Sequence, residues 1–150
     1  MDAFDHFTVL RLSDCEEKIT AKPSVPWTKM ELMLVLNKIN TAGRTGEYIP
    51  AIATDENPPL NLSYLFDEED ERTILQLLSE EHFVDKILDC NSKGSEKEYF
   101  FVFGIYVRLI RREQDSEELY ENVLIYIKIK IFYQDNKFIV VKSFHKNRPK

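Results

Sequence analysis

The stretch that decides the fold is residues 123–131, which read Val-Leu-Ile-Tyr-Ile-Lys-Ile-Lys-Ile. Aliphatic residues fill every second position, namely Val123, Ile125, Ile127, Ile129 and Ile131. Tyr126, Lys128 and Lys130 alternate with them. Because successive side chains of a strand point to opposite faces, this pattern predicts a long strand with one apolar face covered by helices and one polar face.

Two further long strands are predicted, one before and one after this stretch in the chain. Residues 99–111 and 138–145 are dominated by aromatic and β-branched residues, which favour strands. The four residues 134–137 form a hairpin-sized gap, which predicts an antiparallel pair, and the three strands together predict a meander. Shorter strands are expected over residues 7–12 and, as a single edge strand, over residues 48–53.

Helices are predicted ahead of the long strands. Thr28 and Glu31 match a capping box, so a helix is expected from there to about Asn40, with Gly43 as the terminator just past its end. The four acids of residues 67–70 suit the positive end of a helix dipole and predict the start of a second helix. This order of elements is typical of the α+β class, with helices packed on one face of an antiparallel sheet.

A third helix is predicted to follow directly after the second. Ser79 provides its N-cap, and apolar residues at helical spacing provide its buried face. These residues are Phe83, Val84, Ile87 and Leu88. We therefore expect a single α+β domain over residues 1–150. Its parts are a poorly assigned N-terminal extension (1–60), helices (67–90) and an antiparallel sheet (98–146).

The composition of the 150 residues excludes several classes of protein. A hydrophobic content of 43% with 12% aromatics excludes wholesale disorder, and no apolar run approaches the roughly 20 residues of a membrane helix. Cys15 and Cys90 have no metal or redox spacing and no leader opens the chain, so a soluble cytoplasmic protein is expected. The four glycines form no phosphate-binding loop and the three histidines have no zinc spacing, so no cofactor or metal is predicted.

The charge of the chain is divided unevenly along its length. Residues 1–98 carry 10 Lys and Arg against 20 Asp and Glu, whereas residues 99–150 carry 10 against 6. The net charges are therefore −10 and +4. Acidic helices and a Lys-bearing sheet that keep the protein soluble explain this division more simply. Such a division can also steer a polyanion to one face and a cationic protein to another.

The hairpin of the last two strands predicts a cluster of polar side chains. If residues 134–137 form the turn, Tyr126 lies opposite His145 and Lys128 opposite Ser143, away from the isoleucines. A change of one residue in turn length would move His145 to the apolar face. Tyr106 and Arg108 share one face of the preceding strand. An imidazole, cations and stackable phenols are the groups that metal-independent cleavage of RNA requires.

A resemblance to a known family supports this interpretation. Residues 78–86, Leu-Ser-Glu-Glu-His-Phe-Val-Asp-Lys, and the hairpin of residues 125–129 and 138–146 resemble the helix and final hairpin of the MqsR-type mRNA interferase toxins, a RelE-like ribonuclease class. The resemblance covers residues 70–146 and implies an RNA-cutting toxin held in check by an antitoxin. It also implies that the family's helix lysine corresponds to Lys86, although the Tyr-Lys pair of that motif is Val84-Asp85 here.

The candidate site residues fall into three groups. The catalytic candidates are Tyr126, His145, Lys86 and Lys128, where the resemblance supports Tyr126, Lys86 and either His145 or Lys146. The RNA-binding candidates are Tyr106, Arg108, Lys130 and Lys146. The partner-binding candidates are Asp67, Glu68, Glu69, Asp70 and Glu71.

Two functions are predicted by these groups. The first is a metal-independent endoribonuclease toxin that acts on single-stranded RNA and is regulated by a protein partner. The second is a non-enzymatic acidic binding module, such as an inhibitor or immunity-type protein, whose portion of net charge −10 covers a basic nuclease or nucleic-acid-binding target. A scaffold without a ligand is a third possibility, and the oligomeric state is left open.

Overall fold

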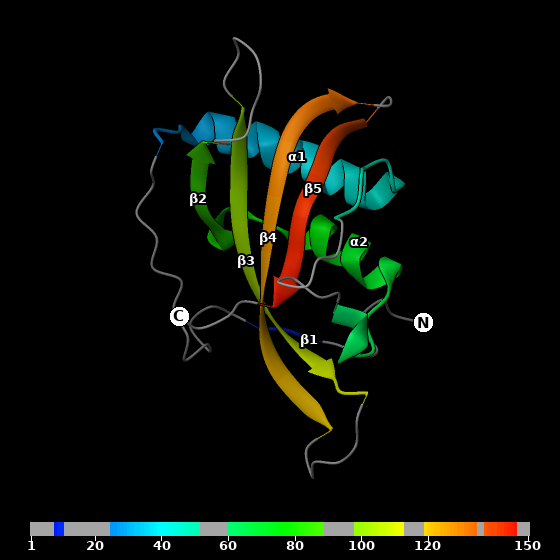
Figure 1. The fold of residues 1–150 in the computed structure, drawn as a ribbon. Helices are drawn as coiled ribbons and strands as arrows, with labels where there is room; N and C mark the ends of the chain where they lie inside the picture. Colours follow the sequence, from blue (N-terminus) through cyan, green and yellow to red (C-terminus); the bar gives the residue numbers. More distant parts are fainter. Residues whose placement is uncertain are drawn as a thin grey trace.

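The computed structural model describes residues 8–10, 25–51, 60–88, 98–112, 119–134 and 137–146. Its elements follow one another as β1 (Thr8–Leu10), α1 (Lys29–Thr45), η2 (Leu60–Leu62), α2 (Glu68–Leu77), η3 (Glu80–His82), β2 (Phe83–Leu88), β3 (Tyr99–Ile110), β4 (Tyr120–Gln134) and β5 (Lys137–Lys146). The described strands form one antiparallel sheet in which β4 lies between β3 and β5, while β1 and β2 both pair with β3 (Figure 1). The predicted α+β class and the predicted meander are therefore confirmed.

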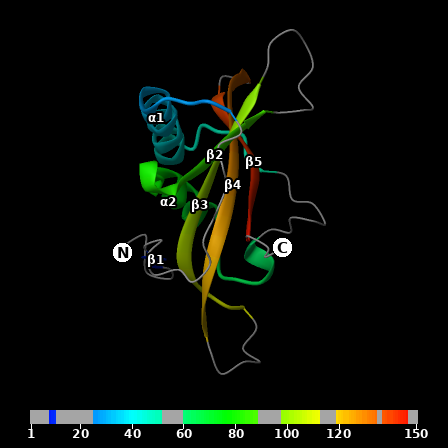
Figure 2. The same cartoon turned by 90° about the vertical axis from the view of Figure 1, so that its left-hand side faces the viewer.

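The hydrophobic core lies between the sheet and the two α-helices, which cover the same face of it (Figure 2). The alternating aliphatic residues of β4 point into this core, and Ile125, Ile127 and Ile129 have no exposed surface. Residues 101, 103, 105, 107 and 109 of β3 point the same way. Burial of each such side chain stabilises the fold by about 1.5–3 kcal/mol, so the period-2 pattern determines which face the helices cover.

Helix α1 begins where predicted but continues one turn longer. The Thr28 side chain accepts a hydrogen bond from the Glu31 amide at 3.1 Å, and the helix ends at Gly46, whose φ of 78° is left-handed. The prediction that Gly43 terminates the helix is wrong. Gly43 lies inside α1 where α2 crosses it, and a Cβ at this position would stand 2.8 Å from the carbonyl oxygen of Arg72. Here glycine permits the close approach of two helices.

We expect Gly43→Ala to lower the free energy of unfolding by about 1–3 kcal/mol, because the added methyl group meets backbone atoms that cannot easily move. The higher helix propensity of alanine offsets only part of this loss. Urea denaturation measures the difference. Arg44→Ala, one residue along at an exposed position, is the matched control and should change stability by less than about 0.5 kcal/mol. A Gly43→Ala variant as stable as the wild type contradicts this explanation.

Helix α2 begins as predicted, with a capping box in which Asp67 accepts from the Asp70 amide and Asp70 accepts from the Asp67 amide. The predicted third helix over residues 83–88 is wrong. Ser79 caps only the single 3-10 turn of η3, and the chain then enters β2, which pairs with β3. The apolar spacing of this short run fits a helix, but pairing with the edge of β3 overrides this local preference and selects the strand.

Smaller departures occur at the sheet edges. The structure describes residues 48–51 of the predicted edge strand 48–53. A hydrogen bond of 2.8 Å from the Val141 amide to the Ile49 carbonyl links this segment to β5. Gln134 pairs with Lys137, so these residues belong to the strands instead of a four-residue turn. Among the described residues, neither α-helix combines the length and the apolar character needed to cross a membrane.

Candidate functional site

The face of the sheet turned away from α1 and α2, which we call the outer face, carries most of the predicted site (Figure 2). Its residues on β3 and β4 are the even-numbered ones, because the odd-numbered ones point into the core. They include Gly104 opposite Tyr126, Val102 opposite Lys128 and Phe100 opposite Lys130. Gly104 has no side chain, so β3 places nothing directly opposite the Tyr126 ring.

Tyr126 and His145 lie side by side on the outer face, as the hairpin register predicts. They form a direct cross-strand pair, and their ring centroids are 5.9 Å apart at an interplanar angle of 51°. Lys128 lies two residues along β4 on the same face and pairs with Ser143. The structure therefore brings together the phenol of Tyr126 and the imidazole of His145, and it places Lys128 nearby on the same face.

Asp85 is a member of this cluster that the sequence-based prediction missed. A β-bulge between Phe83 and Asp85 places Asp85 opposite Val102, on the outer face, where it is buried. Burial and the negative charge of Asp85 both raise the pKa of Tyr126. The phenol is therefore held in its neutral, hydrogen-bond-donating form. No local pattern in the sequence announces the bulge that brings Asp85 to this face.

Lys86 does not belong to the cluster. It pairs with Phe101, so its side chain lies on the helix side of the sheet, where the ammonium group contacts Glu31 of α1 at 2.6 Å. The same ammonium lies 4.7 Å from the centroid of the Tyr99 ring. The bulge of β2 is the physical reason, because without its extra residue Lys86 would pair with Phe100 on the outer face. The sheet thus separates Lys86 from Tyr126 and His145.

The two outer-face lysines of β4 have different surroundings. Lys128 Nζ lies 4.4 Å from the centroid of the Phe100 ring, and Lys130 Nζ lies 4.9 Å from it. Lys130 is only 5% exposed and forms a 2.6 Å ion pair with Glu98. Lys128 is half-buried. A phosphate at this face would therefore meet the ammonium group of Lys128, whereas that of Lys130 is buried and neutralised by Glu98.

Tyr106 and Arg108 share the outer face further along β3. Tyr106 pairs with Leu124, and the exposed Arg108 pairs with Asn122, to whose Oδ1 its Nε donates at 3.1 Å. The step from Gly104 to Arg108 is four residues, about 13 Å along a strand. These two side chains therefore extend the polar track away from Tyr126 instead of joining the central cluster.

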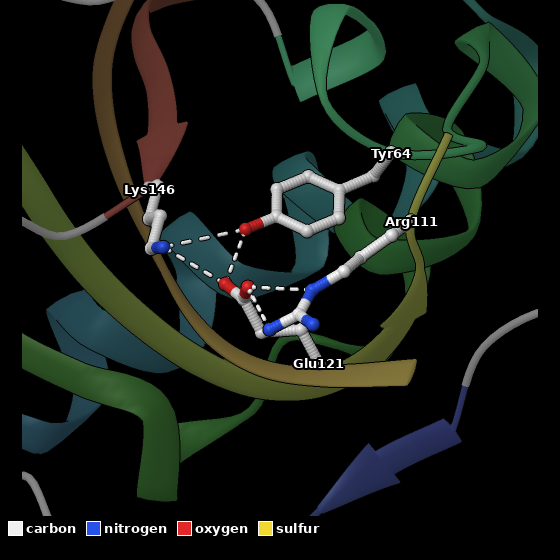
Figure 3. Close-up of polar contacts among 4 residues, drawn as sticks. All are labelled: Tyr64, Arg111, Glu121 and Lys146. Atoms are coloured by element: carbon white, nitrogen blue, oxygen red, sulfur yellow. Dashed lines mark hydrogen bonds and ion pairs between the residues drawn. The ribbon is translucent and has the colours of Figure 1, made fainter. Parts of the chain in front are cut away.

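Lys146 lies on the helix side of the sheet, because it pairs with Ile125. Its ammonium donates to Glu121 at 2.8 Å and to the Tyr64 hydroxyl at 3.3 Å (Figure 3). Tyr64 and Arg111 also donate to Glu121. Burial alone would raise the pKa of Glu121, but the hydrogen bonds from Lys146, Tyr64 and Arg111 outweigh it and lower the pKa to about 2. Lys146 is thus separated from the Tyr126 and His145 pair.

Three of the five acidic residues 67–71 form hydrogen bonds within the fold. Asp67 and Asp70 form the capping box, and Glu71 accepts a hydrogen bond from the Tyr48 hydroxyl at 3.1 Å. Glu68 and Glu69 are exposed in the first turn of the helix. Of the five partner-binding candidates, Glu68 and Glu69 are therefore the two exposed residues outside the capping box.

His82 lies at the end of the 3-10 turn η3, directly before β2. It is buried in η3, and its Nδ1 accepts a hydrogen bond from the Ser79 amide at 3.0 Å. Burial lowers the pKa of His82, and the nearby charge of Glu81 opposes this effect in part. Among the described residues, no group of three or more His, Cys, Asp and Glu side chains is arranged to hold a metal ion.

We expect the contribution of His82 to stability to be complete above about pH 6.5 and to decrease as the pH falls below that value. The reason is that the unfolded state binds the proton more readily, and a protonated ring loses its acceptor at Nδ1. Urea denaturation of wild type and His82→Gln at several pH values between 5 and 8 measures this effect. The stability difference between the two should shrink as the pH falls, and a constant difference contradicts the prediction.

Comparisons with protein-family models, with curated proteins and with solved structures give no match to this chain. The function is therefore argued from the geometry of the outer face.

Proposed function

We propose that this protein is a metal-independent endoribonuclease of the toxin type, with a RelE-like fold, that cuts single-stranded RNA on the outer face of its sheet. The observation that carries the proposal is the direct pairing of Tyr126 and His145, with ring centroids 5.9 Å apart, beside the strand position of Lys128. The two cysteines, Cys15 and Cys90, have no metal or redox spacing, which also supports a reducing, cytoplasmic location.

The reaction divides among three side chains. The His145 imidazole takes the proton of a ribose 2′-hydroxyl, and the 2′-oxygen attacks the adjacent phosphorus. The bond from phosphorus to the 5′-oxygen breaks, and that oxygen receives a proton from the Tyr126 phenol. The products are a 2′,3′-cyclic phosphate and a 5′-hydroxyl, and water returns both side chains to their starting protonation states.

Charge and burial at the outer face support these roles. The raised pKa of Tyr126 keeps its proton in place at neutral pH until the leaving group develops charge. The Lys128 ammonium stabilises the negative charge that gathers on the phosphate in the transition state. Tyr106 and the exposed Arg108 would contact the nucleotides that run along β3 away from the cluster, by stacking and by ion pairing.

The test is an incubation of purified protein with a single-stranded RNA of about 20 nucleotides in the presence of EDTA. We expect cleavage products that end in a 2′,3′-cyclic phosphate, and little cleavage of the same sequence as a duplex, whose bases cannot be splayed out for stacking. RNA that stays intact at equimolar protein contradicts the proposal.

The alternative function is an acidic, non-enzymatic module that binds a cationic protein. The exposed Glu68 and Glu69 favour it, because they lie on the helix layer, on the opposite side of the sheet from Lys128 and Arg108. The same surface suits a regulatory partner of the nuclease. A protein of the alternative class leaves RNA intact and is harmless when expressed, whereas a toxin slows growth.

A further inference from the structure

We propose that Lys146, held by Glu121 and Tyr64, sets the register of the last strand and thereby keeps His145 on the outer face beside Tyr126. Lys146 is then a positioning residue instead of an RNA-binding one. The consequence for RNA cleavage depends on the proposed function, but the structural part of the inference does not.

The register of β5 changes twice along its length. Gln134 pairs with Lys137 at the turn, but Ile131 pairs with Ile139 and Ile129 with Val141, which is a shift of one residue. A second irregularity between Lys128 and Ile129 restores the first register, so that Tyr126 pairs with His145. Because two shifts separate the turn from His145, the turn does not by itself determine which way His145 points.

The second shift decides the face on which His145 lies. If the register of Ile129 and Val141 continued, Ile125 would face His145, and the imidazole would enter the apolar side of the sheet. The amide of Val141 is also tied to the Ile49 carbonyl, which anchors the middle of β5 in that register. Something beyond residue 142 must therefore favour the irregularity.

Two side chains beyond residue 142 point to the helix side in the observed register. Phe144 is buried with its ring centroid 5.8 Å from that of Phe66, and Lys146 contacts Glu121 and Tyr64 (Figure 3). In the continued register Lys146 would face Leu124 on the outer face, and both contacts would be lost. The ion pair of Lys146 with Glu121, its hydrogen bond to Tyr64 and the packing of Phe144 on Phe66 thus stabilise the register that places His145 on the outer face.

The contacts of Lys146 with Glu121 and Tyr64 can be tested by substitution. Glu121 keeps its hydrogen bonds from Arg111 when Lys146 is changed, so the carboxylate is not left without a partner. Its low pKa keeps it ionised at neutral pH, and the hydrogen bond to Glu121 raises the pKa of Lys146. Both charges are therefore present throughout the pH range in which the experiment is done.

The experiment records nuclear Overhauser contacts between the ring protons of Tyr126 and His145 in the full chain. We expect a clear contact in the wild type and in Lys146→Arg, and a loss of most of its intensity in Lys146→Met and in Glu121→Gln. The matched control is Lys86→Met, which removes the 2.6 Å ion pair with Glu31 on the same side of the sheet and should leave the contact intact.

RNA cleavage is measured on the same variants. Lys146→Met should reduce it by about 10²-fold, because the imidazole no longer lies beside its substrate, and Lys146→Arg should restore it. If Lys146→Met does not fold, the judgement rests on Glu121→Gln. Folded variants that keep the full ring contact overturn the inference. A wild type that shows the contact but cuts no RNA contradicts the proposed function and leaves the register inference in force.

Discussion

His145→Ala is expected to lower the rate of RNA cleavage by about 10²–10⁴-fold, because it removes the group that takes the 2′-hydroxyl proton. This corresponds to about 3–5 kcal/mol of the activation barrier. The side chain is half-buried on the outer face, so the substitution should leave the fold intact. The measurement is single-turnover cleavage of a labelled single-stranded RNA, followed by analysis of the cyclic-phosphate product.

Tyr126→Phe tests the second proton-transfer group in the same assay. Phenylalanine keeps the ring that packs beside His145 but removes the proton given to the 5′-oxygen, so cleavage should fall while RNA binding is kept. Tyr120→Phe is the matched control, because Tyr120 is 52% exposed at the start of β4 and takes no part in the cluster. If His145→Ala cuts RNA as fast as the wild type, the assigned chemistry is wrong.

Phe103→Ala is expected to reduce the free energy of unfolding by about 3–5 kcal/mol, through lost burial and the cavity that remains. Phe103 has no exposed surface, and it pairs with Phe83 on one side and Ile127 on the other. Its ring centroid lies 5.7 Å from that of Phe83. The substitution thus removes one of the buried side chains that join β2 to the core, and urea denaturation measures its effect.

Leu62→Ala serves as the control for this prediction, because Leu62 is 66% exposed and its loss should change stability by less than about 0.5 kcal/mol. The β2 pairing should loosen more than the rest of the sheet in Phe103→Ala, which faster amide hydrogen exchange at residues 86–88 would reveal. A loss below 1 kcal/mol would mean that the site collapses around the cavity or that the ring is not packed as described.

Much of the fold could be predicted because its signals are local. The alternation of residues 123–131 predicts a two-faced strand, and strands that follow one another directly in the chain pair as a meander. The capping residues Thr28 and Asp67 mark helix starts through hydrogen bonds within three residues. Such features need no knowledge of distant parts of the chain. The helix end at Gly46 could not be predicted, because Gly43 is required by α2 and not by the helix that contains it.

The candidate site could be predicted only in part, for the same reason. The pairing of Tyr126 with His145 agrees with the register counted from the turn, but two opposite shifts in β5 cancel to produce it. The family resemblance grouped Lys86 with this pair and its basic side chain grouped Lys146 with it, but the structure places both on the helix side. A bulge or a shift changes the face of every residue after it, and no local pattern announces it.

The amino-acid sequence by itself determined that the chain forms an α+β domain with a meander whose central strand turns its isoleucines inward, because alternation and burial act on neighbouring residues. The tertiary structure alone decided that residues 83–88 join the sheet, and that Asp85 instead of Lys86 shares the face of Tyr126. It also decided that Lys146 binds Glu121. These outcomes depend on pairing between segments far apart in the chain, where the edge of one strand or the charge of another selects among conformations of similar local energy.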